Sequence, residues 1–463
     1  MVILLLLLLV LILMSLYIKK YFSLKFGRYL YDVRADQIID WDRSECRKVL
    51  IQKDVAVSGF NLVVSGVAGY DTCFLNIKVD SGLSGIFKEP RVLIENSKGK
   101  KYVQILEYRC SGVRPINVSS LLSPNENVLS LCITSSWCRI LDIGKHAILY
   151  NNSDLIDSKK IVVAPHPDDA EIAAYGLYKK SNKNTFILTV SGGEGGRFVK
   201  SENEKRFVDN KYLSLIRFLD SITIPLRAGI PHDNVINMGY FDNTLEEMYR
   251  DKVVSVKSLY YENLSIDEYR GYNISEIRSE IQGGANWGDF VSDLSSVISK
   301  INPDVFVSPY PVLDTHEDHK YSTVALVEAI MKSGLRSGYL CLYSNRYVQS
   351  EYFPYGPAGS IYSVLPLENN GLFFDRIFSL DLGDGLCVEK KISLEAHYDL
   401  RESVQFMSIR EQFHYILNKI KGCVYNTENS YYRRAMMSNE IFYVIRVEKL
   451  YDEIVRKSVL GEI

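Results

Sequence analysis

The stretch IVVAPHPDDAE, residues 161–171, decides the fold of this chain. Ile161 to Ala164 form a short unbroken apolar run, which is typical of a buried parallel strand. The same alternation of apolar strands and helical patterns continues toward the C-terminus and predicts an α/β domain over 158–450, with a Rossmann-like, mostly parallel sheet and flanking helices. Further strands are expected at 186–190, 235–238, 304–308, 339–343 and 440–447, and helices at 168–180, 203–220, 286–300, 321–334 and 388–421.

Histidine and aspartate residues follow two of these expected strands, at the point where each strand ends. Pro165-His166-Pro167-Asp168-Asp169 comes directly after the first strand, and Asp314-Thr315-His316-Glu317-Asp318-His319 follows the strand at 304–308. Ligands of open α/β sheets bind beyond the carboxyl ends of the strands. The two clusters can therefore meet if their strands are neighbours in the sheet.

The residue types in these clusters suit a catalytic zinc site. His166, Asp169 and His319 offer two nitrogen ligands and one oxygen ligand, and catalytic zinc usually has three protein ligands plus water. Asp168 is then left as a base for that water, and His316 as a hydrogen-bond donor or general acid.

A purely structural interpretation of the same residues is also available. Asp168 can be the N-cap of a helix, with Glu171 completing a capping box. The second cluster would then be a solvated acidic loop with incidental histidines. Three histidines, each beside an aspartate at a strand end, favour the metal site.

The motifs resemble those of the PIG-L/LmbE-like family of zinc-dependent de-N-acetylases. The family pattern is a strand followed by His-Pro-Asp-Asp and a later His-x-Asp-His, and the chain has HPDD at 166–169 and HEDH at 316–319. The glycine-rich loop SGGEGG at 191–196, MGYFD at 238–242 and NEIF at 439–442 resemble other family segments, although Phe241 stands where proline is commoner. The resemblance covers residues 158–450.

The resemblance implies a role for each matching residue. Zn²⁺ is the implied cofactor, with another divalent metal as the alternative. The implied roles are metal ligand for His166, Asp169 and His319, general base for Asp168, support of the oxyanion or leaving amine for His316, and contact with sugar hydroxyls for Arg217 and Asp242.

The region 48–150 has a different character. It contains short segments rich in Val, Ile, Leu and aromatic residues, separated by Gly, Ser, Asn and Pro turns, which predicts a small all-β, sandwich-like domain. No catalytic motif lies there. We expect an accessory packing domain, with carbohydrate binding as the alternative.

The chain begins with a nearly unbroken aliphatic run from Val2 to Ile18. At 1.5 Å per residue this run spans roughly 25 Å as a helix, the short end of what a membrane span requires. No small-residue cleavage site follows, and Lys19, Lys20, Lys25 and Arg28 come after the run. We therefore expect a single-pass anchor at 1–18, a juxtamembrane connector at 19–47 and a catalytic domain on the cytoplasmic face.

The composition excludes several classes of protein. The 54 Lys and Arg residues are balanced by 56 Asp and Glu, so a basic nucleic-acid binder is not expected. Together with the resemblance, the anchor predicts a membrane-bound hydrolase that removes acetyl from an N-acetylhexosamine (GlcNAc-type) in a glycolipid or surface-polysaccharide precursor. The alternatives are a deacetylase or amidase of a small soluble glycoside conjugate, and a catalytically silent glycan-binding membrane protein.

Overall fold

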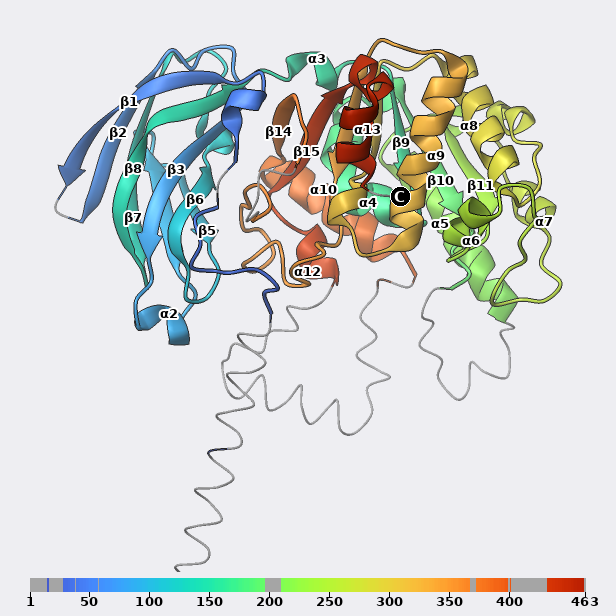
Figure 1. Ribbon diagram of the computed structural model, residues 1–463, viewed down its shortest axis with the longest axis horizontal. Helices are drawn as coiled ribbons and strands as arrows, with labels where there is room; N and C mark the ends of the chain where they lie inside the picture. Colours follow the sequence, from blue (N-terminus) through green and yellow to red (C-terminus); the bar gives the residue numbers. More distant parts are fainter. Residues whose placement is uncertain are drawn as a thin grey trace, which may run out of the picture.

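The computed structural model shows a β domain beside a larger α/β domain (Figure 1). It describes residue 15 and residues 28–37, 39–56, 58–195, 210–366, 372–398, 400 and 431–461. The predicted anchor at 1–18 lies outside these residues except for Ser15. Among the described helices, none combines the length and the apolar character needed to cross a membrane.

The β domain is an eight-stranded sheet in which every neighbouring pair is antiparallel, in the order β5-β4-β7-β2-β1-β8-β3-β6. Burial alternates along strands such as β4, which points one face toward a core of aliphatic side chains. The strands are Arg47–Ala56 (β1), Gly59–Ser65 (β2), Thr72–Asp80 (β3), Arg91–Asn96 (β4), Lys101–Ile105 (β5), Ser111–Asn117 (β6), Val128–Ser136 (β7) and Arg139–Tyr150 (β8), with the short helix α2 at Ser84–Phe87.

The expectation of an all-β domain is confirmed, but the sandwich-like arrangement is corrected to a near-barrel. The reason lies in β1, whose first half, Arg47 to Leu50, pairs with β8 and whose second half, Ile51 to Ala56, pairs with β2. One strand thus joins the two halves of the sheet, and the sheet bends around a single core. At the two edge strands, the Gln104 side chain bridges β5 to the backbone of Pro115 and Asn117 in β6.

The α/β domain has the expected mostly parallel sheet, in the order β11-β10-β9-β12-β13-β15-β14. Strands β9 to β13 are parallel, and β15 is antiparallel to both of its neighbours. The strands are Lys160–Ala164 (β9), Thr185–Ser191 (β10), Val235–Tyr240 (β11), Val305–Pro309 (β12), Tyr339–Tyr343 (β13), Arg376–Asp381 (β14) and Asn439–Arg446 (β15).

Helices cover both faces of this sheet (Figure 1). One layer contains α4, α5 and α10, and the other contains α6, α8, α9 and α13. The helices are Ser153–Ile156 (α3), Asp169–Lys180 (α4), Asn210–Arg227 (α5), Leu245–Arg250 (α6), Ile266–Arg270 (α7), Trp287–Ile301 (α8), Glu317–Ser333 (α9), Gly383–Ala396 (α10), Tyr431–Ala435 (α12) and Glu453–Leu460 (α13).

Two features of the α/β sheet matter for the site. The chain leaves β9 toward β10 on one side and later returns as β12 on the other side, so β9 and β12 flank a topological switch point. Their neighbouring carboxyl ends place residues 165–169 and 314–319 at one edge. The second feature was not expected, because β14 precedes the helical pattern predicted at 388–421. Helix α10 covers the start of that pattern, and residues 401–421 lie outside the described part.

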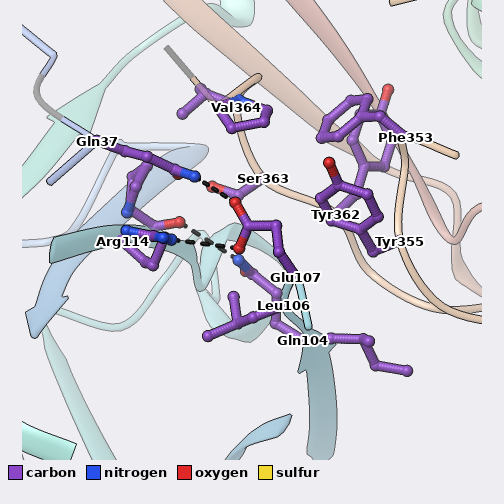
Figure 2. Close-up of a pocket in the computed structure, with 13 residues that line it drawn as sticks. Gln37, Gln104, Leu106, Glu107, Arg114, Phe353, Tyr355, Tyr362, Ser363 and Val364 are labelled. Atoms are coloured by element: carbon purple, nitrogen blue, oxygen red, sulfur yellow. Dashed lines mark hydrogen bonds and ion pairs between the residues drawn. The ribbon is translucent and has the colours of Figure 1, made fainter. Parts of the chain in front are cut away.

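Residues 28–46 run along the junction of the two domains. Leu30 N–H donates to the Gln349 carbonyl of the α/β domain, and Gln37 N–H donates to Val113 of the β domain. A buried ion pair between Glu107 and Arg114 lies beneath this segment, beside a small cavity (Figure 2). The described part of the predicted connector at 19–47 is therefore packed against both domains.

Candidate metal centre

The two sequence clusters meet at the carboxyl edge of the α/β sheet. The three atoms His166 Nδ1, Asp169 Oδ2 and His319 Nε2 lie 3.1, 3.1 and 3.2 Å from one another. Tetrahedral zinc with bonds near 2.0–2.1 Å separates its ligands by about 3.3 Å. The three side chains are almost fully buried. The structure therefore brings two nitrogens and one carboxylate oxygen to the spacing that a metal ion requires.

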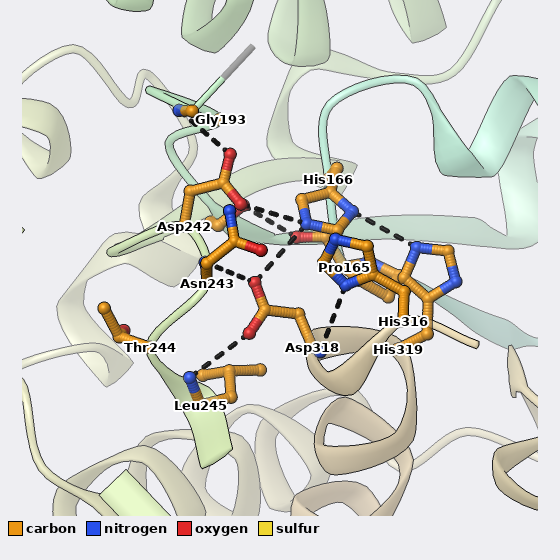
Figure 3. A network of polar contacts seen from close by, with 12 residues as sticks. Pro165, His166, Gly193, Asp242, Asn243, Thr244, Leu245, His316, Asp318 and His319 are labelled. Carbon is orange, nitrogen blue, oxygen red and sulfur yellow. Dashed lines mark hydrogen bonds and ion pairs between the residues drawn. The ribbon is translucent and has the colours of Figure 1, made fainter. Parts of the chain in front are cut away.

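The second nitrogen of each histidine faces a carboxylate. His319 Nδ1 lies 2.8 Å from Asp314 Oδ2. His166 Nε2 lies 3.2 Å from Asp242 Oδ1 and 3.4 Å from Asp318 Oδ2 (Figure 3). Histidines that bind a metal usually donate their other N–H to a carboxylate or carbonyl, which fixes the ring and raises its basicity. The residues present thus fit a metal ion.

Two further contacts hold the parts of this edge together. Asp318 accepts backbone N–H groups of Asn243, at 2.6 Å, and Leu245, at 3.2 Å, and so joins the start of α9 to the loop after β11. Asn345 follows the carboxyl end of β13, and its Nδ2 donates to Asp169 Oδ1 at 2.8 Å. Asp169 is therefore held through Oδ1 while Oδ2 faces the two histidines.

The charges of this group favour a cation. Burial alone would lower the pKa of His319, but Asp169 and Asp314 outweigh burial and raise it to about 9. Burial likewise opposes protonation of His166, yet Asp242 and hydrogen bonds to Asp169 raise its pKa well above the usual value. His319 in turn holds the pKa of Asp169 well below its usual range despite burial. The carboxylates thus attract positive charge to this point, as protons or as a metal ion.

His316 differs from its two neighbours. Burial, followed by the charges of His166 and His319, lowers the pKa of His316 to about 4, so the ring is neutral at pH 7. The Asp318 N–H donates to His316 Nδ1 at 3.2 Å. A neutral ring that accepts at Nδ1 carries its proton on Nε2. His316 therefore offers one N–H donor beside the His166 ring, whose centroid is 4.6 Å away.

The capping alternative for the first cluster fails in the structure. Asp168 is the N-cap of α4, but its side chain makes no capping hydrogen bond. Glu171 contacts the Tyr178 hydroxyl at 2.8 Å and His397 Nε2 at 3.3 Å. It therefore does not complete a capping box. Asp168 instead lies 3.6 Å from Arg217 Nη2, measured at its Oδ1.

The two predicted sugar contacts, Arg217 and Asp242, also lie at this edge, and both are buried. Arg217 Nη1 donates to the Gly193 carbonyl at 2.6 Å and lies 3.9 Å from Asp242 Oδ2. Asp242 accepts the Gly195 N–H at 3.0 Å. Contact of either residue with a sugar stays a prediction. Nearby, burial and Asp242 raise the pKa of Glu194 to about 7.

Sequence reasoning gave no role to three residues of this edge. Asp314 and Asp318 stand within the second cluster, and the cluster itself was the only signal for them. Asn345 carried no motif, although its place just after the apolar strand at 339–343 marks it as an edge residue.

Comparisons with known proteins agree with this site. The family model described as PIG-L, GlcNAc-PI de-N-acetylase, matches residues 161–330. No curated protein matches the chain. Three solved structures illustrate the similarities found, although TM-scores this low carry no weight for the reaction or substrate. They are the A40926 pseudoaglycone deacetylase Dbv21 (13% identity, 63% of this chain and 98% of that chain covered, TM-score 0.34), the zinc-inhibited form of teicoplanin deacetylase Orf2 (14%, 62% and 98%, 0.33) and the conserved protein TT1542 from Thermus thermophilus (17%, 57% and 88%, 0.31).

The family match spans both clusters, from β9 through the first turns of α9 and beyond. The side chains of these clusters form the buried His/Asp group described above, which is able to hold a metal. Through its α/β domain, the chain therefore belongs to the PIG-L/LmbE-like family of metal-dependent deacetylases.

Proposed function

We propose that this protein is a membrane-anchored, zinc-dependent de-N-acetylase that removes acetyl from an N-acetylhexosamine in a glycolipid or surface-polysaccharide precursor. The observation that carries the proposal is the spacing of 3.1–3.2 Å among His166 Nδ1, Asp169 Oδ2 and His319 Nε2. These three residues would hold the zinc ion. When bound, the ion would act as a Lewis acid toward the amide carbonyl and lower the pKa of a coordinated water.

Asp168 is proposed as the general base. Its carboxylate is adjacent in sequence to the ligand Asp169, and the Arg217 guanidinium lies beside it. Asp168 would accept the proton of the attacking water as the carbon–oxygen bond forms. Positioned groups of this kind typically contribute about 10² to 10⁴-fold in rate.

His316 is proposed to assist at the other end of the reacting amide. Its Nε2–H would donate a hydrogen bond to the oxygen that becomes negative during attack. It would then favour departure of the amine, which gains a proton as the carbon–nitrogen bond breaks. The products are acetate and the free amino sugar.

The proposed substrate class follows from the anchor. The apolar run from Val2 to Ile18 favours an acceptor that is itself bound to a membrane. The basic residues after that run favour the cytoplasmic face for the catalytic domain. A small soluble conjugate would give no reason for the anchor, so it ranks second.

Acetate release tests this proposal. The full chain, stripped of metal and reloaded with zinc, is offered N-acetylhexosamine glycolipids, nucleotide sugars and small soluble conjugates. We expect zinc-dependent acetate release that is fastest with a glycolipid. Faster release from a soluble conjugate would favour the second candidate, and absence of release from zinc-loaded protein would contradict N-deacetylation of these sugars.

A further inference from the structure

Exposed apolar side chains gather at one end of the β domain. Leu83 is 80% exposed, Phe87 in α2 is 61% exposed, and Trp137 in the turn between β7 and β8 is 48% exposed. The Ser84 hydroxyl at the start of α2 donates to the Trp137 carbonyl at 3.0 Å, so α2 and the turn are joined. We call Leu83, Phe87 and Trp137 the apolar tip.

The apolar tip lies close to the point where the described chain begins. The Tyr108 N–H donates to the Tyr29 hydroxyl at 3.2 Å, and the next residue, Arg109, donates its N–H to the Gly85 carbonyl in α2 at 3.0 Å. Leu30 beside Tyr29 is 77% exposed. Exposed apolar surface therefore continues from α2 to the first described residues.

This end of the β domain faces the same way as the metal site. Leu30 N–H donates to Gln349, and Arg28 lies 4.0 Å above the Tyr352 ring, both in the loop that follows β13. The same loop begins near Asn345, which holds Asp169. Figure 1 shows α2, the start of the described chain and α12 along the lower side of the molecule.

The sequence limits how far this side can be from a membrane. Residues 19–27 separate the apolar run at 2–18 from Arg28. Nine residues reach at most about 30 Å even when fully extended. If the run is embedded in a bilayer, Arg28 and the apolar tip beside it stay within that distance of the surface.

The composition of the tip suits a lipid surface. Tryptophan is enriched where a membrane meets water, because its ring is apolar and its N–H is polar. Lys88 lies 6.0 Å from the centroid of the Trp137 ring, and Arg139 has a side chain that is 77% exposed. The nearby acidic residues are Asp80, which pairs with Arg139, and Glu89. Exposed basic residues beside exposed apolar ones match phospholipid headgroups above acyl chains.

We infer that the apolar tip inserts into the headgroup region of the bilayer and orients the protein so that its metal-site edge faces the lipid surface. The inference rests on the anchor of the proposed function, and it adds a second membrane contact, made by the β domain. The β domain then acts as a support that sets the height and tilt of the catalytic domain over a membrane-bound substrate.

Trp137 provides its own probe. The chain has three tryptophans, and Trp41 and Trp287 are buried. The full chain is reconstituted into vesicles of phosphatidylcholine with some phosphatidylglycerol, in which part of the lipid is brominated near the headgroup end of the acyl chain. We expect the brominated lipid to quench up to about one third of the emission, and Trp137→Phe to remove the quenched component.

Matched variants separate the tip from general surface effects. Leu83→Ser with Phe87→Ser should reduce quenching of Trp137, whereas Ile454→Ser should not. Ile454 is 79% exposed on α13, which follows the opposite end of the sheet. All variants change exposed residues, so the fold should be retained, and far-ultraviolet circular dichroism checks this.

The outcomes distinguish this inference from the anchor. If the chain floats with vesicles but Trp137 is not quenched by brominated lipid and stays open to aqueous iodide, the tip does not bind lipid and the anchor stands. That result would also be expected if the tip bound another protein, and it would overturn the bilayer as occupant. If the chain does not float with vesicles at all, both the anchor and the tip are contradicted.

Discussion

The two domains bury their strands in different ways, and the difference locates the chemistry. In the β domain, strands such as β4 and β7 alternate between buried and less buried residues, so one face forms the core and the other faces outward. In the α/β domain, every residue of β9 and of β12 is buried. A strand covered on both faces leaves only its ends for polar residues, and there the two clusters meet.

The largest expected effect comes from removing one histidine of the edge. His319→Ala should leave the protein without stoichiometric metal and without measurable deacetylation, because one of three ligands and its partner Asp314 are lost. Elemental analysis of the purified variant measures the metal content. His146→Ala is the matched control, since His146 is an exposed histidine of β8 in the β domain. Full metal content in His319→Ala would break the comparison.

A smaller change at the same edge should separate metal binding from catalysis. Asp168→Asn is expected to keep the metal and to lower kcat by about 10² to 10⁴-fold, because the base is lost while the ligands stay. Parallel measurement of metal content and acetate release checks this. Near-normal turnover in this variant would show that Asp168 is not the base.

The raised pKa values predict how metal binding depends on pH. His319, with a pKa of about 9, and His166, with a pKa well above its usual value, are both protonated at neutral pH without metal. Binding must displace these protons, so affinity should rise with pH by up to about 100-fold per unit between about pH 6 and 8. Chelator competition at several pH values measures the slope. An affinity that is independent of pH would contradict these protonation states.

Asp314 should matter less than the ligand that it orients. Asp314→Asn weakens the hydrogen bond to His319 Nδ1 and removes a charge, and loss of such partners typically costs about 10 to 100-fold in metal affinity. Chelator competition gives the change in Kd. A variant with unchanged affinity would mean that the ring of His319 is held by packing alone.

The smallest effect on the site should come from the core of the β domain. Ile133 in β7 is fully buried, and Ile133→Ala is expected to lower the free energy of unfolding by about 2–5 kcal/mol through lost burial and a cavity. Metal content and acetate release per folded molecule should stay unchanged. Denaturant unfolding and elemental analysis test the two halves of this prediction, and loss of metal would show that the domains are coupled more closely.

The sequence was informative wherever a pattern is local. The run at 161–164 predicted β9 because four adjacent apolar residues have few other uses, and the two clusters predicted the metal centre because each follows a strand. The near-barrel could not be predicted, since it depends on β1 pairing with both β2 and β8.

Contacts between distant residues were beyond sequence reasoning. Asn345 holds Asp169 from 176 positions away, and nothing near Asn345 in the sequence indicates that contact. Strand β14 was missed because it is short and bounded by Arg376 and Asp381. It is satisfied by long-range partners, such as the Thr72 hydroxyl that accepts the Ser379 N–H.

The most direct test of the metal centre is the zinc X-ray absorption spectrum of the full chain loaded with one equivalent of Zn²⁺. We predict a four-coordinate ion with two imidazole nitrogens and light oxygen ligands, and loss of one imidazole in a His319→Ala sample forced to bind at high zinc. A spectrum with sulfur ligands, or one without imidazole, would place the metal elsewhere and contradict the assignment of His166, Asp169 and His319.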